Sequence, residues 1–408
     1  MTVETTVHDV DLLDPALFER GAFWDVFARL RRDAPIFRHP EPDGPGFWVL
    51  SRHRDIMSVY ADQVSFSSRR GMRLDSDPDA VAAVAQRMLI VSDAPDHTHL
   101  KRVLQQSFSA SRMPLVEGLV RQVIGDVLAE AADHGETDFI DVAKLIPNRV
   151  VCALMGIPRS DWEWIGQITT DAFEGDDETV RSGAHGEIFL YFTDLLAERR
   201  RAPGDDIVSA IATAERVADV PGGRRPLSDE EIVFNCNGIL AGANETTRYS
   251  AAGGVLALVD SPDQWALLRG GSPPDLAAEE ILRWTTPGVH AMRTVMRPVR
   301  VAGTLFEPGD RVTLWNVSAN RDEDVFDQAD RFRVDRTPNR HIAFGHGPHL
   351  CLGSRLARLE MTVFVEELAR RVAHVELTGE PRYNASNFTW GLRSLPVRLT
   401  PDRAARRA

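Results

Sequence analysis

The stretch that decides the fold is Phe344-Gly345-His346-Gly347-Pro348-His349-Leu350-Cys351-Leu352-Gly353, near the C-terminus. A proline and three glycines predict a tight backbone around one cysteine. After it, Leu356, Leu359 and Val363 recur every three or four positions, which predicts an amphipathic helix. The cysteine is therefore expected at a helix N-terminus, where unpaired N–H groups favour the thiolate and lower the thiol pKa from about 8.5.

A thiolate in this position is a ready metal ligand. Gly347 and Gly353 let the backbone approach a flat, bulky group, and Phe344 offers an aromatic face to pack against it. The group that this pattern predicts is haem, whose iron a cysteine thiolate can hold. For an isolated Cys-x-Gly, however, a buried structural cysteine beside a glycine turn is the commoner case.

The full spacing, Phe-x-x-Gly-x-x-x-Cys-x-Gly, resembles the haem-ligand loop of the cytochromes P450. Its four fixed positions are filled by Phe344, Gly347, Cys351 and Gly353. The resemblance implies that Cys351 is the proximal iron ligand of haem b and that His349 donates a hydrogen bond to a haem propionate.

Composition limits the class of protein. The chain has 408 residues, 43% hydrophobic and 26% charged, as in a globular protein with a large core, and a formal charge of −13 argues against nucleic-acid binding. Neither a secretory signal nor an apolar run long enough to span a membrane is apparent. Three widely spaced cysteines fit a reducing compartment. We therefore expect a cytoplasmic protein. Length alone does not decide the number of domains, and one domain over residues 1–408 in a monomer is what the resemblance implies.

The segment Ser92-Asp93-Ala94-Pro95 predicts a helix start, followed by His97 and Lys101. Because they are four residues apart, these two side chains lie on one helix face and could both bind one anionic group. They resemble the His-x-x-x-Arg pair of the cytochromes P450, which binds haem propionates. Lys101 stands where arginine is usual, so it offers a point charge without the bidentate fork.

Ser228 to Glu231 form a capping box, and no proline follows until Pro262, which predicts a buried helix of about 30 residues. Its centre is Gly242-Ala243-Asn244-Glu245-Thr246-Thr247. Thr246 can bond back to the carbonyl four residues earlier, and an acid beside a hydroxyl provides a proton path. Alone, this stretch is better explained as a glycine-weakened helix with a satisfied threonine.

The same stretch resembles the Ala/Gly-Gly-x-Asp/Glu-Thr signature of the P450 distal helix. The resemblance implies that Glu245 and Thr246 are the catalytic acid–alcohol pair, with Ala243 in place of the second glycine against the haem. Further along, Glu280 and Arg283 resemble the Glu-x-x-Arg pair that serves folding, and Arg293 resembles a propionate-binding arginine. The expected substrate-pocket residues are Leu240, Asn244, Val289, His290, Met292, Thr389 and Trp390.

The remaining chain is read from local patterns. We expect helices over residues 17–31, 54–62, 113–132, 139–155, 159–173 and 179–201, with Asp275 capping the one that contains Glu280. Strand hairpins are expected for 35–37 with 47–50 and for 295–301 with 311–315. Residues 65–89 are expected to form a long loop. The resemblance implies that this loop is part of the roof of the substrate pocket. If two of Arg69, Arg70 and Arg73 point inward, an anionic or carbonyl-rich substrate follows. Residues 175–178 read as a lid or a plain solvated loop.

Together these signatures predict a mainly α cytochrome P450 fold, an α-helical domain with a small β-rich region. The resemblance implies a haem-thiolate monooxygenase that inserts one atom of O2 into a small organic substrate by hydroxylation or epoxidation, in bacterial secondary metabolism (polyketide, peptide or terpenoid; antibiotic biosynthesis).

Ferredoxin and ferredoxin reductase are the expected electron donors, since the chain has no flavin, nucleotide or iron–sulfur motif. Lys101, Arg102, Arg340, Arg355 and Arg358 form the expected docking patch. Oxidative coupling or ring closure on the same fold remains open. A non-catalytic haem sensor or a peroxide-driven enzyme has no need for Glu245 and Thr246.

Overall fold

The computed structural model describes residues 10–42, 44–106, 113–174, 177–217 and 223–402. Its α-helices are α1 (Pro15–Glu19), α2 (Phe23–Asp33), α3 (His53–Ala61), α4 (Pro78–Val84), α5 (Asp96–Gln106), α6 (Met113–His134), α7 (Phe139–Leu154), α8 (Trp162–Glu174), α9 (Glu178–Arg201), α10 (Ile207–Ala212), α11 (Asp229–Asp260), α12 (Pro262–Arg269), α13 (Pro274–Thr285), α14 (Asn316–Ala319) and α15 (Ser354–Arg371). Short 3-10 turns are η2 (Leu89–Val91), η3 (Arg159–Asp161) and η4 (Gly347–His349).

The strands form one larger sheet and several small ones. The five-stranded sheet has the order β1 (Ile36–His39), β2 (Phe47–Leu50), β10 (Arg311–Trp315), β7 (His290–Val295), β3 (Phe66–Ser67), with only the β2–β10 pair parallel. A three-stranded sheet has the order β11 (Val372–Leu377), β14 (Pro396–Pro401), β4 (Glu136–Asp138). The two-stranded pairs are β5 (Glu215–Val217) with β6 (Arg224–Pro226), β8 (Val299–Val301) with β9 (Thr304–Phe306), and β12 (Arg382–Tyr383) with β13 (Leu392–Ser394).

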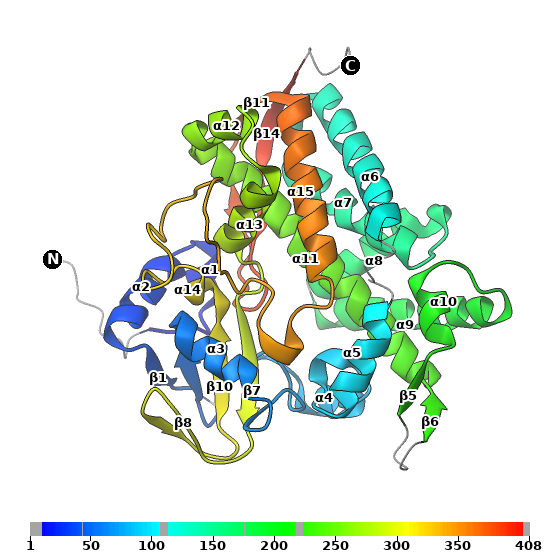
Figure 1. Ribbon diagram of the computed structural model, residues 1–408, viewed down its shortest axis with the longest axis vertical. Helices are drawn as coiled ribbons and strands as arrows, with labels where there is room; N and C mark the ends of the chain where they lie inside the picture. Colours follow the sequence, from blue (N-terminus) through cyan, green and yellow to red (C-terminus); the bar gives the residue numbers. More distant parts are fainter. Residues whose placement is uncertain (1–9, 43, 107–112, 175–176, 218–222, 403–408) are drawn as a thin grey trace.

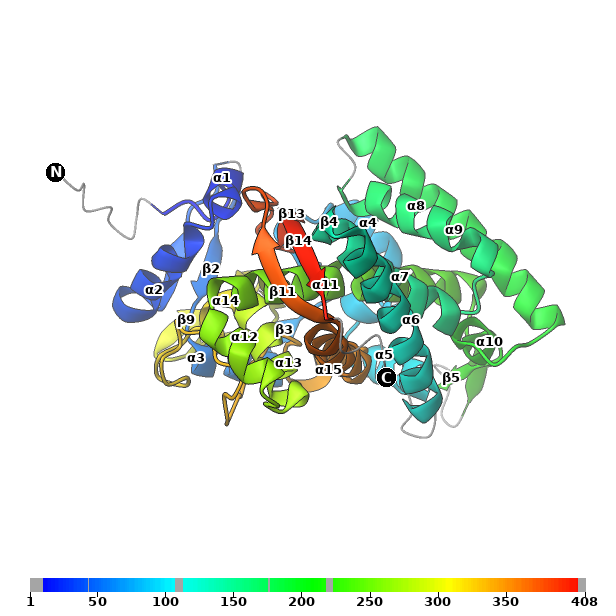
Figure 2. The same cartoon turned by 90° about the horizontal axis from the view of Figure 1, so that it is seen from above.

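Helix α11 crosses the middle of the molecule, with the five-stranded sheet on one side and helices α6 to α10 on the other (Figures 1 and 2). It runs 32 residues, and the predicted capping box is present: the Ser228 hydroxyl accepts the Glu231 N–H, and the Glu231 carboxylate accepts the Ser228 N–H. Its residues belong to both large helical core clusters, for example Val255 in one and Cys236 in the other. This sharing supports one domain over the chain, which stays a prediction.

Several predicted elements differ in detail. Residues 17–31 form two helices rather than one, because Gly21 takes a left-handed φ of +64° between them. The antiparallel partner of β10 is β7, so the hairpin expected from 295–301 is wrong; residues 299–301 pair with β9 instead. Helix α13 is preceded by Pro273, and Asp275 lies inside its first turn rather than capping it.

Glu280 and Arg283 are the best-buried ion pair of the described chain, each with a fully buried side chain. Their carboxylate and guanidinium make two hydrogen bonds of 2.7 and 2.8 Å. Glu280 also accepts from Arg336 Nε at 2.9 Å, and Arg283 donates to the backbone carbonyls of Asn320 and Ala329. The pair therefore ties α13 to the irregular segment that precedes the cysteine loop, which confirms its structural role.

The loop between α8 and α9 is described only in part. Residues 175 and 176 of the expected lid lie outside the described residues, while Asp177 caps α9 by accepting the Val180 N–H at 2.8 Å. None of the described helices is long and apolar enough to cross a membrane.

Candidate functional site

The cysteine loop is a turn built on η4 and closed by one backbone bond. Gly347 takes a φ of +67°, and a Cβ on it would lie 2.7 Å from the Tyr60 carbonyl oxygen. The Cys351 N–H donates to the Phe344 carbonyl at 2.9 Å. The turn and the contact with α3 therefore require glycine at position 347, and its expected approach to a flat ligand stays a prediction. A Cβ on Gly353 would meet nothing within 4 Å, so this glycine leaves open space.

Of the three cysteines, Cys152 and Cys236 are buried and Cys351 is exposed. Burial raises the pKa of Cys152 to about 12. The expected lowering of the Cys351 pKa is wrong: desolvation by the surrounding protein raises it, although the Gly353 N–H bond and the cations of Lys101 and Arg358 oppose the rise. A bound metal cation would favour the thiolate, since it deprotonates a coordinating thiol outright.

Helix α5 holds this loop from the side. Lys101 Nζ donates to the carbonyl oxygens of Pro348 and, at 2.8 Å, of Leu350, which stand three residues and one residue before the cysteine. The Lys101 ammonium is thus engaged by the loop backbone, and its expected contact with a haem propionate stays a prediction. Leu352, the next residue after the cysteine, packs against the core cluster that contains Leu104 of α5 and Leu240 of α11.

Four basic side chains converge beside the loop: His97, Lys101, Arg293 and His349. The rings of His97 and His349 lie 3.9 Å apart between centroids. Burial and mutual repulsion lower the pKa of His97 to about 4 and that of His349 to about 2, with Lys101 and Arg293 among the repelling charges.

Arg293 lies on β7, fully surrounded by protein. Its guanidinium sits 5.5 Å from the Tyr60 ring centroid and donates to the Met292 carbonyl at 2.7 Å. The one carboxylate that acts on both Arg293 and His97 is that of Asp93. A group with two carboxylates fits the cluster, because the Arg293 guanidinium would pair with its negative charge and the two imidazoles, which are neutral near pH 7, could each donate an N–H. Sequence reasoning missed Tyr60 and used Asp93 only as a helix-start signal.

The expected acid–alcohol pair lies on α11 without the two groups bonding each other. Thr246 Oγ1 donates to the Gly242 carbonyl at 3.0 Å, four residues earlier, as the pattern predicts. Glu245 Oε1 instead accepts a hydrogen bond of 3.0 Å from Thr389 Oγ1. Burial raises the Glu245 pKa to about 7, against the opposing effects of the Thr389 bond and of Arg73. A Cβ on Gly242 would meet nothing within 4 Å, so this helix face is open.

Two pocket candidates on α11 are on the wrong face. At 100° per residue, Leu240 and Asn244 lie about 160° around the axis from Gly242. Leu240 is fully buried in a core cluster, and Asn244 is buried with its amide donating to the Leu240 carbonyl at 2.9 Å. Ala243 lies between the two faces, partly buried against the same cluster.

Most of the substrate-pocket candidates on and near β7 are also core residues. Along a strand, successive side chains alternate faces, so His290 and Met292 point away from the face that carries Arg293. His290 packs on Trp315 and Phe388, and Met292 and Val289 are buried. Trp390 is a core residue: its indole N–H donates to the Phe18 carbonyl at 2.9 Å and its ring stacks on Tyr383. Among the C-terminal candidates, Thr389 is the one that reaches α11.

The roof loop contributes one arginine to this region. Arg73 lies 5.6 Å from the Phe388 ring and is close enough to Glu245 and His290 to affect their pKa values. Its own ion-pair partner is Asp75 at 3.2 Å. Arg69 and Arg70 are exposed. Two inward-pointing arginines were the condition for expecting an anionic or carbonyl-rich substrate, and this condition is not met.

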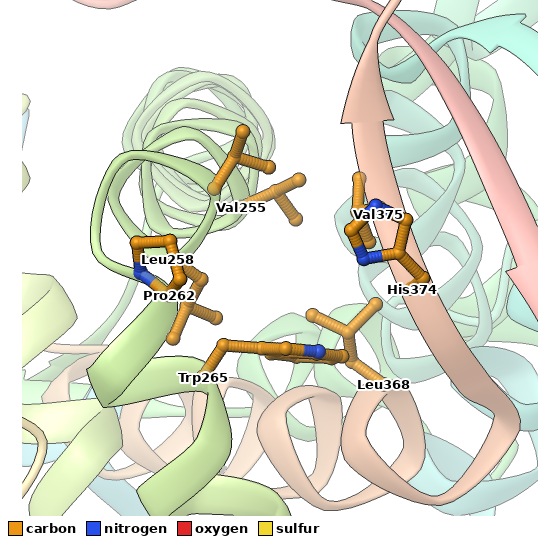
Figure 3. A pocket seen from close by; sticks show the side chains of 8 residues that line it. Val255, Leu258, Pro262, Trp265, Leu368, His374 and Val375 are labelled. Atoms are coloured by element: carbon orange, nitrogen blue, oxygen red, sulfur yellow. The ribbon is translucent and has the colours of Figure 1, made fainter.

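A separate cavity of about 70 Å³ lies at the far end of α11. It is lined by Val255, Leu258, Val259, Pro262, Trp265, Leu368, His374 and Val375. Figure 3 shows these side chains, contributed by α11, α12, α15 and β11. From Thr246 to Leu258 the helix rises about 18 Å, so this apolar space is remote from the acid–alcohol pair.

Comparison with known proteins agrees with this geometry. Residues 275–393 match the family model described as cytochrome P450. Over 401 residues the chain is 36% identical to cytochrome P450 NovI of Streptomyces niveus, covering 97% of each chain. Linalool 8-monooxygenase of Pseudomonas putida is also 36% identical, over 96% of this chain and 99% of that protein. The crystal structure of P450 OxyD, involved in the biosynthesis of vancomycin-type antibiotics, superposes with a TM-score of 0.87 at 35% identity, over 96% of this chain and all of that one.

The chain therefore belongs to the cytochrome P450 family. It is a P450 monooxygenase, and its cofactor is haem b held by a cysteine thiolate.

Proposed function

We propose that this monooxygenase hydroxylates or epoxidises a small organic substrate in bacterial secondary metabolism, with Cys351 as the iron ligand. The observation that carries the ligand assignment is that Cys351 alone among the three cysteines is exposed, on a loop clamped by Lys101. When bound, haem supplies the activation of O2.

The basic cluster would orient the cofactor. His97, Arg293 and His349 face one region with a single nearby carboxylate, so two propionates would pair with the Arg293 guanidinium and accept N–H bonds from the two imidazoles. Lys101 is assigned to holding the cysteine loop through its carbonyl oxygens. Phe344 connects the start of the loop to α15: its ring centroid lies 4.6 Å from the Arg358 guanidinium, and Arg358 is paired with Glu279 of α13.

Glu245 and Thr246 would manage protons on the distal side. The Glu245 carboxyl, with a pKa raised to about 7, can hold or release a proton near neutral pH, as a proton carrier requires. Gly242 leaves the helix open beside them, and Thr246 keeps its hydroxyl at this opening by bonding the Gly242 carbonyl. A haem sensor has no need for this arrangement.

The substrate class is proposed from relatives. OxyD, by its title, is involved in the biosynthesis of vancomycin-type antibiotics, and linalool 8-monooxygenase, by its name, acts on linalool. Both are about one-third identical over nearly the whole chain, which supports a role in tailoring a polyketide, peptide or terpenoid product.

Electrons are proposed to come from a ferredoxin and its reductase. Three of the five basic residues expected at the docking face are exposed: Arg102, Arg340 and Arg355. Of the other two, Lys101 binds the backbone of the cysteine loop and Arg358 pairs with Glu279. The three exposed arginines support docking of an acidic partner. The protein is proposed to act as a monomer in the cytoplasm, where the three unpaired cysteines would remain reduced.

The test is turnover under ¹⁸O2. Ligands that shift the haem spectrum would be offered to the enzyme with a ferredoxin, its reductase and labelled oxygen. Hydroxylation or epoxidation places one ¹⁸O atom in the product. Oxidative coupling or ring closure, the alternative on the same fold, gives product without the label. Product formation that proceeds without O2 would refute the proposal.

A further inference from the structure

The Glu245 carboxyl is held from the C-terminal turn rather than by its neighbour on α11. Thr389 Oγ1 donates to Glu245 Oε1 at 3.0 Å, while the Thr246 hydroxyl donates to the Gly242 carbonyl. Within the part of the chain that the structure describes, Thr389 is the hydrogen-bond donor to this acid. The side chain that sets where the Glu245 carboxyl points therefore comes from 144 residues further along the chain.

The backbone around Thr389 is fixed on both sides. Residue 389 forms a bridge with Gly288, and the Trp390 N–H donates to the Pro287 carbonyl at 2.9 Å. The Thr389 carbonyl accepts from Asn384 Nδ2 at 2.9 Å. The hydroxyl is therefore presented to Glu245 from a rigid base, and only rotation about one side-chain bond can remove it.

The turn also lies directly against α11. A Cβ on Gly391 would lie 2.3 Å from Cγ of Tyr249, which stands one helical turn after Glu245. Asn384 Nδ2 lies 3.2 Å from the Tyr249 hydroxyl oxygen, so the same asparagine contacts both the turn and the helix. Only a residue without a side chain at position 391 permits this approach, and the approach brings Thr389 within reach of the acid.

Two other charged or titratable groups face Glu245. Arg73 acts on it from the roof loop and favours the carboxylate. Tyr249 acts from α11; burial raises the pKa of this tyrosine to about 12, and the Glu245 charge adds to that rise. Burial has the opposite and larger effect on Glu245. The hydrogen bond from Thr389 and the charge of Arg73 are thus the two influences that lower the Glu245 pKa against the effect of burial.

We propose that Thr389 is a positioning residue for Glu245: its hydroxyl anchors the carboxyl to the 384–391 turn and so governs when the acid takes up and gives away its proton. This inference rests on the proposed role of Glu245 in proton delivery. It assigns Thr389 to the proton path, where the sequence pattern had suggested a substrate contact.

The experiment is an infrared titration of the holoprotein. The Glu245 carboxyl band is identified as the one that Glu245→Gln removes, and its midpoint is expected near pH 7. Thr389→Val keeps the shape but removes the donor, so the ionised form loses a hydrogen bond and the midpoint rises by about one pH unit. Thr389→Ser restores the hydroxyl and returns the midpoint to the wild-type value. Thr378→Val, the same substitution at an exposed site, leaves it unchanged.

The second readout is the pH dependence of peroxide release during turnover, whose midpoint moves with the infrared midpoint in Thr389→Val. In a Glu245→Gln background, Thr389→Val causes no further change. An unmoved midpoint in Thr389→Val, or a shift that serine does not reverse, overturns the inference. Failure of the proposed function looks different, since the thiolate–haem spectrum or label incorporation is then missing in the wild type, while the titration still reports on Thr389.

Discussion

Replacing Glu280 by glutamine tests whether the buried Glu280–Arg283 pair holds the segment that leads into the cysteine loop. The carboxylate is fully buried and pairs with Arg283 and Arg336, whose side chains are 0% and 4% exposed. Glutamine removes the negative charge, yet both guanidiniums remain inside the protein. Breaking a buried pair in this way costs about 3–5 kcal/mol, because one charge is left uncompensated.

The assay is urea unfolding of the holoprotein, followed by tryptophan fluorescence and by haem absorbance. The matched control is Glu376→Gln, which breaks the exposed pair with Arg398, both side chains being about half exposed (45% and 52%). That pair is worth about 0–1 kcal/mol. If Glu280→Gln unfolds with the same free energy as the control, the ion pair does not anchor this segment and the reasoning is refuted.

Three further predictions concern the site itself. Lys101→Met removes both hydrogen bonds to the cysteine-loop carbonyls, so haem loss to apomyoglobin becomes about tenfold faster, whereas Lys101→Arg retains most of the binding; equal rates for all three proteins would contradict the clamp. Because the folded protein lowers the pKa values of His97 and His349 to about 4 and about 2, the unfolded chain binds more protons below about pH 6.5, and the haem-free protein loses stability as pH falls from 6.5 towards 4; urea midpoints that stay constant from pH 7 to pH 5 would argue against the basic cluster. Thr246→Ala diverts reducing equivalents from product to peroxide, measured as peroxide formed per NADH consumed, and unchanged coupling would remove Thr246 from the proton path.

The sequence predicts well those features that depend on neighbours in the chain. The capping box at Ser228 and the proline at 262 define the ends of α11 because both signals act within one helical turn. The cysteine loop is likewise recognisable from a short run of glycine and proline spacing. The back-bond of Thr246 to Gly242 follows from helix geometry alone.

Features that depend on distant partners were predicted less well. Leu240 and Asn244 are expected in the pocket from the sequence, whereas the tertiary packing assigns their side of α11 to the core. An exposed ion pair on a helix can have the same three-residue spacing as the buried Glu280–Arg283 pair, so the spacing does not predict the burial of the pair. The targets of Lys101 and Glu245 lie 247 and 144 residues away in sequence, and no local pattern specifies them.

The central claim is that the sulfur of Cys351 binds the haem iron. The most direct measurement is the carbon monoxide difference spectrum of the reduced protein, recorded for the wild type, for Cys351→Ala and for Cys152→Ala, the last removing a buried cysteine. The thiolate–haem Soret band is predicted in the wild type and in Cys152→Ala, and it is absent in Cys351→Ala. A normal band in Cys351→Ala would contradict the account.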